Sequence, residues 1–368
     1  MLWKVCTLSF SAGFLLVAPV HADPDSAIQA DSALLESLVA QNEATVRKLE
    51  SSPLYAEYTW RTTKTMSPIP SPDGADLSGP MVIEGRARYW RDGASFCEDK
   101  DVRNTWTASG EVRDVSNIFM INDRYAVNYY KEFHELHLYQ LDDRNNLYQA
   151  VKSKVEINPY PDILRFGTRY STRRTLKEAY EGELGGGQAD YRWTPSEIDL
   201  DGKPYYKIVV ERIEGAKMLH QKEILLDPRS GFLIAESSTY NKTGDPFYIV
   251  QARFQQLADG MCFPKSASRK LTQDNEIMNI EVEKVTLGDP EIGKMITLEA
   301  LDIDRESTIM YEYSNRGTQR TLKGYWGDKW VLLDLLPPEV RKAIGEAQRK
   351  ANVASQHLQG LPNKENER

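Results

Sequence analysis

Apolar and polar residues alternate with a period of two along most of the chain. In the segment 54–63 the even positions begin with Leu54, Ala56, Tyr58 and Trp60, and the odd positions are mostly polar. This alternation is typical of a strand that buries one face. Turn signals such as Asp92-Gly93 separate the alternating segments. The pattern predicts strands over 54–63, 81–90, 94–99, 112–121, 125–130, 133–141, 191–200, 205–213, 219–226, 232–240, 247–257, 262–271, 276–287, 308–313 and 321–325.

Other segments depart from this alternation. Asp31 and Ser32 are favourable N-cap residues for an amphipathic helix that ends before Pro53. Its apolar stripe consists of Leu34, Leu35, Leu38, Val39, Val46 and Leu49. Irregular spacing over 159–184 predicts one or two further helices, and Pro337-Pro338 opens a short one before a polar tail. The segment 67–80 holds four Pro and two Gly and is predicted to be an exposed loop.

About a dozen alternating strands do not form an open flat sheet without curling or splitting. Helices interrupt the series instead of alternating with each strand, so the predicted class is α+β, mainly β. We expect a strongly curved antiparallel sheet, an open half-barrel, with helices covering its concave face. The predicted organisation is a signal peptide over 1–22, the half-barrel domain over 23–290, a C-terminal hairpin extension over 291–336, and a short helix with a disordered tail over 337–368.

The first 22 residues have the layout of a secretory signal peptide. Lys4 precedes an uncharged apolar core, and Val20-His21-Ala22 places small residues before a cleavage point at Asp23. The apolar run is shorter than the ~20 residues of a membrane-spanning helix, although an N-terminal anchor stays the alternative. The mature protein is therefore expected in the periplasm or secreted, with peripheral or transient membrane contact at most.

Composition limits the partners of the protein. Its 46 Lys and Arg residues are outnumbered by 54 Asp and Glu residues, for a net charge of −8. An acidic chain of this kind does not favour binding to nucleic acid through phosphate neutralisation. After export, Cys97 and Cys262 are the remaining cysteines, and an oxidising compartment permits a disulfide between them. Two separate buried thiols are the alternative, and the sequence does not decide between them.

Catalytic and metal-binding motifs are weak in this sequence. His134 and His137 form the main histidine cluster, but in the predicted strand 133–141 positions three apart point to opposite faces. No Gly-x-Ser-x-Gly nucleophile motif is present, and the acidic residues are scattered. We therefore expect a non-catalytic protein with no metal site and no cofactor.

The run from Lys222 to Leu233, with Asp227-Pro228-Arg229-Ser230-Gly231 at its turn, resembles a strand–turn–strand of the periplasmic lipoprotein carrier (LolA-like, RseB-like) superfamily. The resemblance continues through the turn at 240–244 to Cys262-Phe263-Pro264, where an aromatic–proline pair begins a strand. It extends over about 32–290 of the chain. The resemblance implies an unclosed half-barrel that holds acyl chains between its sheet and its helices, and a role linked to outer-membrane lipoprotein sorting.

Aromatic residues in successive strands form the most informative feature of the sequence. By alternation they share one face of the sheet, and the candidates for the wall of an apolar cavity are Tyr58, Trp60, Tyr89, Phe96, Phe119, Tyr206 and Phe254. Tyr and Trp suit such a wall because each has an apolar body and a polar tip. An ordinary packed core beneath the helices is the alternative reading of these rings.

Two functions follow from these observations. The first is an exported, non-catalytic carrier or receptor for an acyl-bearing lipid or a lipoprotein. The second is an envelope protein-interaction or signalling module with a solid core, whose sheet binds a partner protein.

Overall fold

The computed structural model describes residues 24–66, 79–140, 163–171, 174–185, 190–214, 217–273, 275–314 and 319–359. The predicted signal peptide, most of the predicted loop at 67–80 and the C-terminal tail lie outside these residues. No described helix is long and apolar enough to span a membrane.

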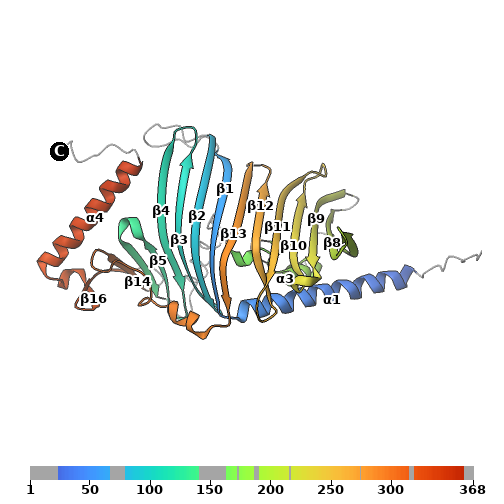
Figure 1. Cartoon of the computed structure of the whole chain (residues 1–368), viewed down its shortest axis with the longest axis horizontal. Helices are drawn as coiled ribbons and strands as arrows, with labels where there is room; N and C mark the ends of the chain where they lie inside the picture. Colours follow the sequence, from blue (N-terminus) through green and yellow to red (C-terminus); the bar gives the residue numbers. More distant parts are fainter. Residues whose placement is uncertain are drawn as a thin grey trace, which may run out of the picture.

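The described residues form one open, curved 16-stranded sheet with few helices (Figure 1). The mainly β class predicted from the alternation is therefore confirmed. The strand order across the sheet is β16-β15-β14-β6-β5-β4-β3-β2-β1-β13-β12-β11-β10-β9-β8-β7. The strands are β1 (Leu54–Met66), β2 (Gly79–Asp92), β3 (Ser95–Trp106), β4 (Glu111–Ile121), β5 (Tyr125–Tyr130), β6 (Glu135–Gln140), β7 (Asp190–Leu200), β8 (Lys203–Glu214), β9 (Lys217–Asp227), β10 (Leu233–Tyr240), β11 (Pro246–Gln256), β12 (Cys262–Leu271), β13 (Glu276–Leu287), β14 (Ile309–Ser314), β15 (Gln319–Trp326) and β16 (Lys329–Leu332).

The predicted strands agree with the observed ones to within a few residues in most cases. β5, β12 and β13 match their predicted bounds, whereas β3 runs to Trp106, beyond the predicted 94–99. The chain course also differs in one respect, because β14 pairs with β6 in parallel, while the other strand pairs of the described sheet are antiparallel. Local alternation predicts strands, but it does not reveal a pairing between segments so far apart in sequence.

Three described α-helices accompany the sheet: α1 (Pro24–Ser51), α3 (Leu176–Gly185) and α4 (Pro338–Gln359). The predicted start of α1 near Asp31 is wrong. Ser32 lies inside the helix, where its Oγ donates a hydrogen bond to Glu36 Oε1 at 3.4 Å, one turn later. The helix predicted after Pro337 is present but is 22 residues long, so it is not short.

The sheet has two faces, which alternation assigns residue by residue. We call the face that carries Tyr58 and Trp60 the helix face, because α1, α3 and α4 pack on it. We call the opposite face, which carries Thr59 and Arg61, the outer face. In Figure 1, α1 runs along the lower edge of the β8–β13 half, and α4 lies at the other end of the molecule.

The core on the helix face is divided among several clusters. Leu35, Leu38 and Val39 of α1 pack with Leu176 of α3 against β8, β9 and β10. Further along α1, Val46 and Leu49 join the largest cluster, over β1, β2, β12 and β13. At the other end, residues before and within α4 pack on β14, β15 and β16 through Leu336, Val340 and Ile344. The two helical covers are separate, and α4 also contacts β4 and the 3-10 helix η1 (Lys131–Phe133).

The segment after β13 covers part of the outer face. The 3-10 helix η4 (Pro290–Met295) contacts β2, and Ile296 and Leu301 pack with residues of β3 to β6 and β14. The hairpin expected in the C-terminal extension is present and continues the same sheet beside β6. Parts of strands β3 to β6 are therefore buried on both faces of the sheet.

This arrangement decides between the two readings of the cysteines. Cys97 lies on the outer face, in the cluster with Ile296, and Cys262 lies in the cluster of the helix face. Both are buried free thiols. The structure therefore corresponds to the second alternative, two separate buried thiols, because the two residues pack in different clusters on opposite faces of the sheet.

Candidate functional site

The structure places all the predicted wall residues on the helix face. Tyr58, Trp60 and Tyr89 are core residues, with 0%, 3% and 5% of their surface exposed. The other four are only half-buried and lie in three different clusters: Phe96, Phe119, Tyr206 and Phe254. The middle of the aromatic stripe, on β1 and β2, is therefore solid core, and the half-buried rings lie on both sides of it.

The rings form a connected path across the strands. The centroids of Tyr58 and Trp60 are 5.9 Å apart within β1. Tyr89 of β2 stacks on Phe96 of β3 at 6.0 Å, and Phe96 lies 5.6 Å from Phe119 of β4. These separations fall in the range in which aromatic pairs attract each other.

The path extends further than the sequence predicted. Tyr139 of β6 packs, like Phe96 and Phe119, against Ile121 and Ala126, and its ring stacks on Tyr313 of β14 at 4.6 Å. His137 stacks on Tyr311 at 4.9 Å, one step along the same strand pair. We call the rings of β2, β3, β4, β6 and β14 on this face the aromatic ribbon: Tyr89, Phe96, Phe119, His137, Tyr139, Tyr311 and Tyr313. Alternation could have placed each ring on a face, but only the parallel pairing of β6 with β14 joins them.

A buried polar group lies beside the aromatic path. The hydroxyl of Tyr58 donates to Oε1 of Glu98 at 2.5 Å, and Nζ of Lys100 lies 2.5 Å from Oε2 of the same carboxylate. Glu98 and Lys100 are 5% and 3% exposed. Burying a charged pair costs free energy unless each charge is well partnered, so this pair fixes the position of β3 within the face. The sequence did not predict it, because charged residues at 98–101 contribute to both faces of β3.

A second buried charge ties the segment before α3 to the sheet. Lys222 of β9 is 6% exposed, its Nζ lies 3.6 Å from the centroid of Tyr170, and it donates a hydrogen bond to the Tyr170 carbonyl. Burial lowers the pKa of Lys222 to about 8, while the nearby Glu183 opposes this shift. Burial raises the pKa of Glu183 itself. Lys222 therefore links β9 to both ends of the 170–183 segment.

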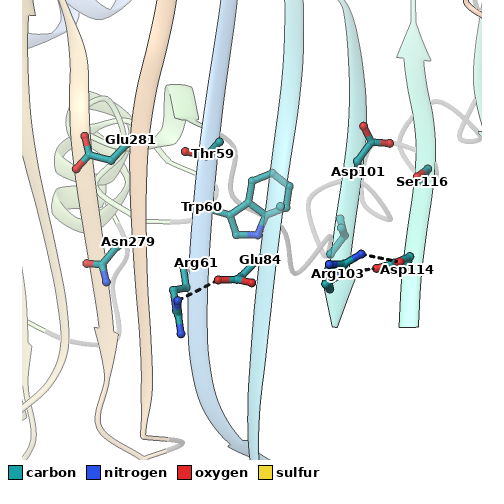
Figure 2. Close-up of a pocket in the computed structure, with 12 residues that line it drawn as sticks. Thr59, Trp60, Arg61, Glu84, Asp101, Arg103, Asp114, Ser116, Asn279 and Glu281 are labelled. Carbon is teal, nitrogen blue, oxygen red and sulfur yellow. Dashed lines mark hydrogen bonds and ion pairs between the residues drawn. The ribbon is translucent and has the colours of Figure 1, made fainter. Parts of the chain in front are cut away.

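The outer face carries a shallow groove of about 700 Å³ over β13, β1, β2, β3 and β4 (Figure 2). Its rim holds two ion pairs between neighbouring strands, Arg61 with Glu84 at 3.0 Å and Arg103 with Asp114 at 2.9 Å. Asp101 and Glu281 add two further carboxylates, so acidic groups outnumber basic ones. The floor is formed by residues whose side chains belong to the other face: Trp60, Gly85 and Val102. The side chains that line the groove from the outer face are therefore all polar or charged.

The two histidines lie in different surroundings. His134 is in the turn before β6, which begins at Glu135, and its Nδ1 lies 3.7 Å from Asp304. His137 is in β6, where Nδ1 is 3.1 Å from the hydroxyl of Tyr313 and Nε2 is 3.4 Å from Glu135. Within the described part of the chain, no group of three or more His, Cys, Asp or Glu side chains is arranged to hold a metal ion.

The comparisons with known proteins find similarity at the level of structure. No family model matches the sequence, and no curated protein matches it. A LolA superfamily protein from Nitrosomonas europaea is 12% identical, and the match covers 73% of this chain and 99% of that one at a TM-score of 0.32. A DUF1329 family protein from Desulfovibrio piger is 8% identical at a TM-score of 0.33, with the same coverage. A domain described as an outer membrane lipoprotein-sorting protein, from Vibrio parahaemolyticus, is 10% identical over 71% of this chain and 97% of that one, at a TM-score of 0.30.

At these identities and TM-scores the resemblance to the LolA-like superfamily stays a prediction from the sequence. At these TM-scores the likeness says nothing of a ligand or of site residues, which depend on the geometry of this chain itself.

Proposed function

We propose that this protein is an exported, non-catalytic carrier or receptor that binds an acyl-bearing lipid or lipoprotein along the aromatic ribbon. The observation that carries the proposal is the connected row of half-buried rings on the helix face, from Phe96 and Phe119 to Tyr139 and Tyr313. In this proposal the helix face is the concave side of the half-barrel. A chain then lies on the row of rings between α1 and α4, with α4, which contacts β4, beside it.

The chemistry of the rings supports an apolar ligand. A flat row of aromatic rings offers a large contact area with few rotatable bonds, so little conformational entropy is lost when a chain binds. Each methylene that leaves water contributes roughly 0.8 kcal/mol. A long acyl chain that buries part of its length can therefore offset the cost of ordering it on the sheet.

Export and the periplasm form part of the same proposal. The signal layout at 1–22 supports it, and a carrier of apolar molecules has a role where such molecules must cross an aqueous space. The absence of a recognisable nucleophile motif in the sequence supports a binding role instead of catalysis.

A substitution in the ribbon tests the proposal. Phe119→Asp places a charge on the half-buried part of the ribbon, where an isolated charge is poorly solvated against an apolar chain. We expect a fluorescent acyl probe to bind the wild type with micromolar affinity or better, and Phe119→Asp to weaken this binding at least tenfold. Val112→Asp is the matched control, because Val112 lies in the same strand but on the outer face and is 40% exposed.

The outcomes separate the two functions that the sequence left open. Loss of probe binding in a folded Phe119→Asp protein, with binding retained in Val112→Asp, supports the carrier. Failure of the folded wild type to bind any acyl probe contradicts it and favours the interaction module.

The outer-face groove supports this second candidate function. Its acidic excess, with four carboxylates against two arginines, is complementary to a basic segment of a partner protein. Pull-down of envelope partners by the wild type, but not by a protein with Asp101→Asn and Glu281→Gln, would favour this reading.

A further inference from the structure

The helix face contains two buried amide oxygens that lack hydrogen-bond partners. They are Oδ1 of Asn117 in β4 and Oδ1 of Asn128 in β5, and neither has a partner among the described residues. A buried polar atom without a partner costs roughly 1–3 kcal/mol. Such atoms are uncommon in folded proteins and call for an explanation.

Both amides lie directly beside the aromatic ribbon. Phe119 pairs with Asn128 across the β4–β5 ladder, and Asn117 lies two residues before Phe119 on the same face of β4. Neighbours of this kind on one face of a sheet are close enough for their side chains to meet a common group. The two oxygens therefore border the point where the ribbon passes Phe119.

The surrounding polar groups are already paired in the structure. Nδ2 of Asn128 donates to the hydroxyl of Tyr130 at 2.7 Å. Lys100, the cross-strand neighbour of Asn117, is paired with Glu98. The two amide oxygens are therefore acceptors that lack donors. The cation nearest to them, the ammonium group of Lys100, is already neutralised by Glu98.

We propose that Asn117 and Asn128 form a binding site for the neutral, hydrogen-bond-donating head group of the acyl-bearing ligand, a hydroxyl or an amide N–H. This inference rests on the proposed function and specifies the head group of its ligand. A hydroxyl both donates and accepts, so it satisfies either orientation of each amide. An anionic head group would meet Glu98 and the carboxylate of Glu135, which stands beside Tyr130 in the next strand, while the Lys100 ammonium is already paired with Glu98 and the His137 ring, opposite Asn128, already contacts Glu135.

Four competitors with the same C16 chain test this site by displacement of a fluorescent acyl probe from the full mature protein. Monopalmitoylglycerol presents hydroxyls, N-palmitoylglycinamide presents amide N–H groups, methyl palmitate presents no donor, and palmitate presents an anion. We expect at least one of the first two to displace the probe at a tenfold lower concentration than methyl palmitate and palmitate do. Which of the two is stronger identifies the source of the donor.

The variant Asn117→Leu with Asn128→Leu removes both acceptors and keeps the branched shape and the number of side-chain heavy atoms. We expect the preference for the donor-bearing competitor to fall below threefold, while displacement by methyl palmitate stays within twofold of the wild type. The replaced oxygens have no partner among the described residues, but Asn128→Leu also removes the hydrogen bond from Nδ2 to Tyr130, so a small fall in melting temperature is expected from that substitution and none from Asn117→Leu. Asn279→Leu, an exposed amide on the outer face, is the matched control and should keep the full preference.

The results distinguish this inference from the proposed function. Equal displacement by donor-bearing and donor-free competitors, stronger displacement by palmitate, or a preference that survives in the double variant overturns the head-group site and leaves the carrier intact. Failure of every competitor to displace the probe, or of the probe to bind, overturns the carrier and the head-group site together. If the double variant melts lower than the wild type, each single leucine variant is compared instead, and each is expected to lose part of the preference.

Discussion

The ring of Trp60 lies directly over Gly85 of the neighbouring strand. The two residues pair across the β1–β2 ladder, and a Cβ atom at Gly85 would overlap Cζ2, Cη2 and Cε2 of the indole. Glycine in a strand normally weakens it, because it has no side chain to pack and loses more entropy on folding. Here it is required by the close approach of a large ring that fills the core of the helix face.

The first prediction is that Gly85→Ala destabilises the protein by about 2–3 kcal/mol, although alanine has the better strand propensity. The added methyl group has no space unless the buried Trp60 ring moves. Urea denaturation of the purified mature protein, with the midpoint and slope compared between variants, measures this loss.

A double-mutant cycle tests the cause. In a Trp60→Phe background the smaller ring leaves room, so the cost of Gly85→Ala is expected to fall by at least about 1 kcal/mol. Gly345→Ala in α4 is the control, since a Cβ there meets nothing within 4 Å and alanine favours a helix. If the losses of stability from Gly85→Ala and Trp60→Phe simply add in the double variant, the ring of Trp60 is not the group that excludes a side chain at residue 85.

The second prediction concerns the buried pair of Glu98 and Lys100. Glu98→Gln leaves the ammonium group of Lys100 without its carboxylate, and we expect a loss of about 3 kcal/mol. Adding Lys100→Met removes the unbalanced charge, so the double variant is expected to be more stable than Glu98→Gln alone. A double variant less stable than the single one, in the same denaturation experiment, would contradict the view that the pair is held by charge.

The third prediction is a dependence of stability on pH that arises from Lys222. Its pKa is about 8 in the folded protein against an ordinary value of 10.5. Between these values the unfolded chain binds a proton that the folded protein has lost, so the free energy of unfolding rises with pH. Below pH 8 both states are protonated, and the full cost of burying the charge is present, about 3 kcal/mol for this shift.

Lys222→Met removes this contribution. We expect the variant to be no less stable than the wild type at pH 7, and the difference between the two to change by about 1.4 kcal/mol per pH unit above pH 8. Tyrosines and cysteines with raised pKa values act in the opposite direction, but they are common to both proteins and cancel in the difference. A difference that stays constant from pH 7 to 9.5 would show that Lys222 keeps its ordinary pKa.

The fourth prediction is that Cys97 and Cys262 stay reduced in the purified protein. Burial raises the pKa of both thiols, which makes them poor nucleophiles in the folded state. We expect iodoacetamide to modify both only after denaturation, with no reductant required. A peptide that joins the two residues, found by mass spectrometry of a non-reduced digest, would contradict the packing of these residues on opposite faces.

The sequence by itself determined the strands and the face to which most side chains belong. Alternation in segments such as 54–63 and turn signals such as Asp92-Gly93 act locally, and the backbone of a strand turns successive side chains to opposite faces wherever it lies. For this reason the seven predicted wall residues all lie on the helix face, from Tyr58 to Phe254.

Only the tertiary structure decided what covers each face and which distant strands meet. The parallel pairing of β6 with β14 joins His137 to Tyr311, and no local pattern specifies it because its stability comes from contacts between segments far apart in the chain. The crossing of residues 290–301 over the outer face buries Cys97 away from Cys262 and makes β3 buried on both sides. Two-sided burial also explains why the charges at 98–101 obscured the alternation. A period of two shows which residues share a face, but burial depends on the elements that the whole fold packs against that face.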